Sequence, residues 1–377
     1  MSYDPQDLSY LPSIPVEASE KLRLEMADKG RKDLFYLTKA ILGYDKLTVG
    51  AHGALCKFLQ TCPFTRRAVH MPRGHFKTTI STIAHSIQLV LNDPNIRILI
   101  IAGTSLNAER FMLEIRKHFE MNPLFRWLYS EIIPENFNKA RWNNQEIEVV
   151  RTKVWREPTI DCIGSRGMAE SRHYDVIKAD DIIGKKEFES DSEMAKAVEW
   201  TLSLEPLLVN PSCQMDFIGS RWRRDDVYDA IHKHFGEDEK PVPIGPHAVK
   251  RGSIAIFTRE PFENGEVIFP EQRDASGRVV AGFSKKFFLR MMKKRPDYYA
   301  AQYANNPKAP GIAAFREEWL RYWDWKKTQS EGIIDLFDHE GTKLSTIKVD
   351  QLDLVVFFDP SVAENKKSSR QGLLVVG

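Results

Sequence analysis

Two short motifs carry residue types that could bind and cleave a phosphate chain. The run Lys77–Thr79, a lysine followed by two threonines, opens an apolar segment directly after a turn that contains Gly74. Farther along the chain, a β-rich run ends on two adjacent carboxylates, Asp180 and Asp181. A helix N-terminus with a lysine binds phosphates, a hydroxyl and an acid hold Mg2+, and a neighbouring acid orients an attacking water. Together the two motifs predict ATP hydrolysis.

The first motif departs from the usual phosphate-loop pattern. Met71 and Phe76 stand where that pattern has glycines, so the cradle of backbone N–H groups must be built differently around Gly74. We assign Thr78 and Asp180 to the metal and Asp181 to the water. The expected nucleotide-binding residues are Arg73, Gly74, His75, Phe76, Lys77, Thr78 and Thr79. The alternatives are an ordinary helix start at the threonines and a solvated turn at the acid pair.

The elements around these motifs alternate between strand and helix, which indicates an α/β fold with a parallel sheet flanked by helices. The pattern predicts strands near residues 68–70, 96–102, 159–162, 175–179 and 214–219. Helices are expected over residues 77–91, 106–122, 186–199 and 225–234. The segment 96–102 is nearly all apolar, as expected for a strand buried on both faces.

Before and after this alternating region, the sequence predicts other kinds of segment. Residues 1–20 predict a loose arm, followed by a helix around 20–42. The segment 237–280 is rich in proline, glycine and charge, with short β-like pieces at 253–257 and 266–269. Residues 283–303 predict a basic helix, and 320–343 reads as a linker. A strand over 352–359 and another from 372 begin a further domain.

A third strand tip, residues 216–222, places Ser220 where it could sense a γ-phosphate. The ordered set of motifs resembles the large terminase subunit of tailed bacteriophages. The resembling pieces are Pro72–Thr78, Asp180 with Asp181, Ile218–Trp222 with Asp225, Asp226 and Tyr228, Gln302–Pro307 with Phe315 and Trp319, Asp359–Ser361, and His52 in a preceding helix.

The resemblance implies a P-loop NTPase sheet, a small lid or linker subdomain and the first strands of an RNase H-like domain. It divides the chain into an N-terminal arm and helix (1–44), an ATPase core (45–236), a lid/linker subdomain (237–345) and the start of a nuclease domain (346–377). The implied function is a motor that uses ATP and Mg2+ to move viral double-stranded DNA into procapsids. The implied partners are the portal protein, the small terminase subunit and further copies of the chain in a ring, in the host cell cytoplasm.

Arginines that neutralise transition-state charge can come from the same subunit or a neighbour. The resemblance suggests Arg73 in cis, while Arg166 and Arg172 could act in trans. For Arg166 and Arg172 the alternative is surface charge or contact with the DNA backbone. Glu170 is a candidate helper for Asp181. Asp359 is the expected nuclease ligand for two divalent ions, Mg2+ or Mn2+, and a single such carboxylate predicts that this chain leaves DNA uncut.

Composition limits the classes of protein to which this chain can belong. The 377 residues are 42% hydrophobic and 28% charged, as in a soluble globular protein. The net charge of +2 neither supports nor excludes a nucleic-acid partner, and any face that binds one must be local. No apolar run approaches the roughly 20 residues that span a bilayer. Four scattered cysteines indicate a reducing compartment and no zinc site. A helicase-like translocase and a non-hydrolysing nucleotide-binding scaffold remain as alternative functions.

Overall fold

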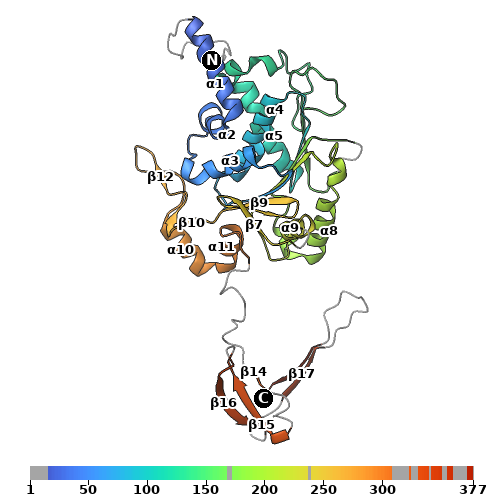
Figure 1. Ribbon diagram of the computed structural model, residues 1–377, viewed down its shortest axis with the longest axis vertical. Helices are drawn as coiled ribbons and strands as arrows, with labels where there is room; N and C mark the ends of the chain where they lie inside the picture. Colours follow the sequence, from blue (N-terminus) through green and yellow to red (C-terminus); the bar gives the residue numbers. More distant parts are fainter. Residues whose placement is uncertain are drawn as a thin grey trace. The chain divides into compact units, whose positions relative to one another are not determined.

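The chain forms two compact units, Met1–Lys308 and Ala309–Gly377 (Figure 1). The computed structural model describes residues 16–167, 172–236, 239–307, 322–323, 330–338, 341–349, 355–359 and 372–376.

A nine-stranded mixed sheet with the order β3-β4-β2-β5-β6-β1-β9-β8-β7 organises the first unit. Its strands are β1 (Arg66–His70), β2 (Ile98–Ala102), β3 (Glu146–Ile147), β4 (Ile160–Gly164), β5 (Val176–Asp180), β6 (Gln214–Ile218), β7 (Val242–Gly245), β8 (Ala248–Arg251) and β9 (Ile254–Thr258). The six strands from β4 to β9 in this order are parallel, whereas β3 at one edge and β8 and β7 at the other are antiparallel to their neighbours. The predicted α/β class is confirmed, with antiparallel edges that the sequence did not indicate.

Strand β2 shows why this sheet is covered on both faces. Ile98 and Ile100 pack into one hydrophobic cluster, and Leu99 and Ile101 pack into the other. Because successive side chains of a strand point to opposite faces, an all-apolar strand requires two cores. The helices of the first unit supply both covering layers.

The helices that accompany the sheet start and end at local signals. They are α1 (Val16–Lys32), α2 (Leu34–Tyr36), η1 (Leu37–Ile41), η2 (Val49–Gly53), α3 (Ala54–Thr61), η3 (Thr79–Ala84), α4 (His85–Asn92), α5 (Ser105–Met121), α6 (Pro123–Leu128), η4 (Ser130–Ile132), α7 (Lys185–Glu189), α8 (Asp191–Leu202), η5 (Glu205–Leu207) and α9 (Val227–His234). The helix predicted over 186–199 is divided at Ser190, whose side chain accepts from the Glu193 amide and caps α8. Within the described residues, no helix is long and apolar enough to cross a membrane.

The remainder of the first unit is a small aromatic-rich layer after β9. It contains β10 (Phe262–Glu263), β11 (Glu266–Val267), β12 (Gln272–Arg273), β13 (Val279–Ala281), α10 (Lys285–Lys294) and α11 (Pro296–Gln302). The single helix predicted over 283–303 is interrupted before Pro296, which lacks an amide hydrogen and starts α11 instead. Phe288, Tyr299 and Tyr303 form the core of this layer.

Two predicted boundaries are corrected by the strand pairing. Strands β7, β8 and β9 continue the main sheet, so residues 242–258 belong to it rather than to a lid/linker subdomain that starts at 237. Residues within the predicted linker 320–343 form β14 (Tyr322–Trp323), β15 (Ile333–Phe337) and the start of β16 (Lys343–Lys348), an antiparallel sheet of the second unit. The second unit also contains the antiparallel pair β17 (Val355–Asp359) and β18 (Gly372–Val376), near the two strands predicted there.

Candidate active site

The loop after β1 leads directly into a helix that begins at Lys77. Gly74 has φ +78°, and a Cβ at this position would lie 2.8 Å from the Phe283 ring, so glycine is required here. The Arg73 amide donates to the Gln302 carbonyl at 3.0 Å, and the His75 amide donates to the Pro72 carbonyl at 3.2 Å. These two N–H groups therefore already have partners within the chain.

Lys77 extends from this loop to the tip of β5. Its Nζ donates to Asp181 Oδ2 at 2.8 Å, and the lysine side chain is 10% exposed while that of Asp181 is 48% exposed. Burial alone would lower the pKa of Lys77, but the charges of Asp181 and Asp180 outweigh it and raise the pKa. The lysine is therefore charged and is neutralised by the acid pair.

Asp180 is fully buried below this ion pair. Its two carboxylate oxygens accept from Thr78 Oγ1 at 3.3 Å and from Thr82 Oγ1 at 2.5 Å. Burial, followed by the charge of Asp181, raises the pKa of Asp180 to about 7. The two adjacent acids thus have different environments, one enclosed and one open.

Asp181 adopts an unusual backbone conformation at the strand tip. Its φ is +45°, and its amide donates to the Ile218 carbonyl of β6 at 2.8 Å. A left-handed conformation is uncommon for residues other than glycine and marks sites where the surrounding structure imposes it. The turn sends the Asp181 side chain toward Lys77 while Asp180 stays in the core.

Lys77 and Asp181 border a cleft of about 770 Å³ at the carboxyl ends of the parallel strands, whereas Thr78 and Asp180 are not among the residues that line it. Open α/β sheets bind ligands at this edge, and the volume is in the range of small-molecule sites. The expected site residues Arg73, Gly74, Lys77, Asp181, Arg166 and Ser220 line it. Further lining residues are Gly103, Thr104, Asn107, Ser165, Ile183, Gly184, Lys185, Lys186, Glu187, Trp222 and Gln302.

Two expected nucleotide-binding residues have other surroundings. His75 is fully buried and stacks on Phe283 at 5.0 Å with an interplanar angle of 6°. Phe76 packs edge-on against His52 and Phe269 and has φ +56°. We call these five residues the aromatic cluster; they pack below the loop, and neither His75 nor Phe76 is among the described residues that line the cleft, nor is Thr79.

The three arginines singled out from the sequence are in different places. Arg166 lines the cleft and donates to Glu193 Oε2 at 2.7 Å, with Glu187 at 3.7 Å. Arg172 is bound instead to Asp161 and to Glu146, at 3.1 Å from the latter, and is not among the cleft-lining residues. Arg73 is exposed at the cleft, and its guanidinium is 3.4 Å from Gln302 Oε1.

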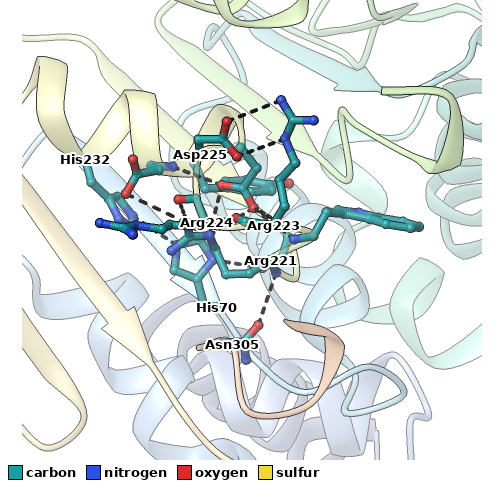
Figure 2. Close-up of polar contacts among 12 residues, drawn as sticks. His70, Arg221, Arg223, Arg224, Asp225, His232 and Asn305 are labelled. Carbon is teal, nitrogen blue, oxygen red and sulfur yellow. Dashed lines mark hydrogen bonds and ion pairs between the residues drawn. The ribbon is translucent and has the colours of Figure 1, made fainter. Parts of the chain in front are cut away.

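The loop after β6 is fixed by one buried ion pair (Figure 2). Arg221 Nε donates to both oxygens of Asp226 at 2.9 and 3.0 Å, and Asp226 also caps α9 by accepting from the Asp229 amide. Gln302 Nε2 donates to the Arg221 carbonyl at 2.7 Å. Gln302 therefore binds both the loop after β1, through Arg73, and the loop that carries Ser220.

A buried charge network supports the site from below. Asp216 of β6 accepts from Arg67 of β1 at 2.7 and 2.9 Å and from Lys178 of β5 at 2.8 Å. Lys178 also donates to the Ser81 carbonyl at 2.7 Å. All three charged side chains are within 2% of complete burial, and breaking one partner of such a pair is strongly destabilising.

Sequence reasoning missed Thr82, Gln302 and this network. Thr82 follows Thr78 by one helical turn, which is a usable signal for a shared partner. Nothing in the local sequence connects Gln302 to Arg73. Glu170 lies outside the described residues, and Asp359 is the last residue of β17, opposite Gly372, in the second unit.

Comparison with protein-family models and with curated proteins finds no match for this chain. A functional proposal therefore rests on the geometry of the site.

Proposed function

We propose that this chain is an ATP-hydrolysing motor subunit acting on double-stranded DNA, of the kind represented by the large terminase subunits of tailed bacteriophages. The observation that carries the proposal is the convergence of Lys77 and Thr78, from the helix start after β1, on Asp181 and Asp180, from the tip of β5. A lysine, a hydroxyl and two acids that meet at a helix start, beside a cleft that Lys77 and Asp181 line, are the groups that phosphoryl transfer requires.

The exposure of Lys77 and Asp181 suggests a separate role for each in the reaction. Lys77 would turn from Asp181 to the β- and γ-phosphates and offset the charge that develops there. Asp181, released and half exposed, would accept a hydrogen bond from the attacking water and orient it toward the γ-phosphorus. The water oxygen forms a bond to that phosphorus while the bond from phosphorus to the bridging oxygen breaks. The proton that the water loses passes to the released phosphate, so ADP and inorganic phosphate are the products.

Thr78 and Asp180 fit Mg2+. Both offer hard oxygen donors, and Mg2+ in nucleotide sites uses few protein ligands beside phosphates and waters. Asp180 has no exposed surface, so it would act through the Thr78 hydroxyl or a water. When bound, the ion would supply further neutralisation of phosphate charge.

The proposal extends to the expected portal, small-subunit and ring partners, to DNA cleavage through Asp359 in an RNase H-like fold, and to the host cell cytoplasm. Two observations favour a second function, a nucleotide-binding scaffold without turnover. In the structure Lys77 is paired with the acid that would activate water, and Phe76 stands at a position where glycine is usual.

ATP turnover by the purified chain, with Mg2+ and with or without duplex DNA, separates the two. We expect turnover that DNA increases and that Lys77→Ala abolishes without lowering the thermal unfolding midpoint by more than a few degrees. Lys185→Ala is the matched control, because Lys185 also lines the cleft but its side chain is 80% exposed and, among the described residues, forms an ion pair only with Glu189. ATP binding without turnover would support the scaffold, and normal turnover by Lys77→Ala would overturn the motor site.

A further inference from the structure

Helix α10 carries a dense positive surface away from the cleft. Its ten residues include five cations and no acid, and the cations are Lys285, Lys286, Arg290, Lys293 and Lys294. All five are exposed. The chain as a whole has a net charge of only +2, so this concentration is local.

Most of this charge has no carboxylate partner among the residues that the structure describes. Lys285 lies 3.8 Å from Glu266, but none of the other four cations forms an ion pair with a carboxylate of the described residues. Spacings of three, four and eight residues place four of these cations along one face of the helix. They are Lys286, Arg290, Lys293 and Lys294. We call this surface the α10 basic face.

The opposite side of α10 is fixed in the aromatic layer. Phe288 is fully buried, and Ser284 caps the helix by accepting from the Phe287 amide at 3.2 Å. Phe283, directly before the cap, stacks on His75 of the phosphate loop. The α10 basic face is therefore held at a defined position relative to that loop.

We propose that the α10 basic face binds the phosphate backbone of double-stranded DNA. The inference rests on the proposed function, whose DNA-contacting surface it assigns. A ten-residue helix is about 15 Å long, and duplex DNA presents about nine phosphate charges over that length. Several lysines without acidic partners match such a polyanion because each can displace a condensed counterion.

Two other polyanions fit less well. Single-stranded nucleic acid is bound by basic grooves that also offer aromatic rings for stacking, and the aromatic residues of α10 are turned into the aromatic layer. An anionic membrane surface is bound by helices with a free apolar face, and on α10 only Leu289 and Met292 are exposed apolar residues. Duplex DNA needs neither feature.

The test is the affinity of the full chain for a fluorescent duplex of mixed sequence, measured by anisotropy across a salt series. The triple variant Lys286→Gln, Lys293→Gln and Lys294→Gln should bind at least about tenfold more weakly at about 0.1 M salt. The slope of log affinity against log salt should fall by about 0.9 for each phosphate that the variant no longer neutralises. Turnover of ATP without DNA should stay unchanged, while its stimulation by DNA should disappear.

The matched control removes the same charge from another exposed helix, through Lys21→Gln, Lys29→Gln and Lys32→Gln on α1. Wild-type affinity in the α10 variant, with its DNA stimulation intact, would overturn this inference and leave the motor standing. Absent ATP turnover together with α10-dependent duplex binding would overturn the motor and leave this surface standing. No duplex binding by the wild-type chain, or binding only to single strands or to vesicles rich in phosphatidylserine, would overturn the inference.

Discussion

The ammonium group of Lys77 lies 2.8 Å from the carboxylate of Asp181, so the proposed phosphate ligand and the proposed water-orienting acid neutralise each other. A nucleotide that uses the lysine must first compete with this acid. The pair would keep the buried lysine charged in the free protein and would release Asp181 only when phosphates arrive. Binding and activation of water are then linked through one side chain.

Asp181→Asn should therefore separate binding from turnover. Because the amide no longer holds Lys77 as an ion pair, ATP should bind about two- to fivefold more tightly, the scale of a partly exposed ion pair. Hydrolysis should fall by at least about 10²-fold, since the water loses its acceptor. Calorimetric titration and a phosphate-release assay measure the two effects, and normal hydrolysis in this variant would mean that another acid orients the water.

The backbone of Phe76 provides a test of loop strain. Phe76→Ala and Phe76→Gly both remove the ring from His52 and Phe269, but only glycine adopts φ +56° without steric cost. Phe76→Gly should thus be more stable than Phe76→Ala by about 1 kcal/mol. Urea unfolding measures the difference, and equal stability would show that this conformation carries no strain.

The hydroxyl group of Thr82 should stabilise the buried carboxyl group of Asp180. Thr82→Val keeps the shape but leaves one oxygen of a buried carboxyl group without its donor, which should lower the free energy of unfolding by about 1–3 kcal/mol. The Mg2+ concentration for half-maximal turnover should rise. Thr82→Ser retains the hydroxyl and serves as the control; a loss of similar size in both variants would point to packing rather than to the hydrogen bond.

Arg166 lines the cleft of its own chain, unlike Arg172. Arg166→Ala should reduce turnover by on the order of 10³-fold if it stabilises transferred charge, and Arg172→Ala should leave turnover much less affected. Turnover per subunit should also be independent of protein concentration. Activity that rises steeply with concentration or on assembly with portal would instead indicate an arginine supplied by a neighbouring subunit.

Buried histidines should make the first unit sensitive to acid. Burial lowers the pKa of His52, His70, His75 and His118 to about 4, and it lowers the pKa of His85 and of His232 well below the ordinary histidine value. Between the ordinary histidine pKa of about 6.5 and about 4, the unfolded chain binds protons that the folded chain does not. Stability should therefore be fully present above about pH 6.5 and fall as the pH decreases through that window, by about 1.4 kcal/mol per pH unit for each net proton.

Asp180 has the opposite effect on stability and stabilises the folded chain as the pH falls. Its pKa of about 7 means that, between about pH 7 and its ordinary pKa of 3.8, the folded chain holds a proton that the unfolded chain has released. One carboxyl group opposes six imidazoles, so the net effect is loss of stability in acid. Urea unfolding at about pH 7 and about pH 5 measures it, and Asp180→Asn should steepen the decline. Equal free energies of unfolding at the two pH values would contradict the assignment of neutral buried histidines.

Much of the first unit is encoded by local pattern. The nearly all-apolar run at 96–102 predicts a doubly buried strand, because a strand that is apolar on both faces requires two cores. The turn at Gly74 followed by Lys77 predicts a helix start. Asp180 and Asp181 were expected at a strand tip for the same reason. These features depend on neighbours in the chain, and so a single sequence specifies them.

Only the tertiary structure decided which distant residues meet. Parallel pairing places β6 between β1 and β5 and aligns their carboxyl ends, which brings Lys77 to Asp181 across 104 positions of sequence. It also adds β7, β8 and β9 to the sheet, joins Gln302 to Arg73, and turns the Phe76 ring into the aromatic cluster. Strand order and long-range side-chain partners arise from packing between segments, and no local propensity along the chain contains that information.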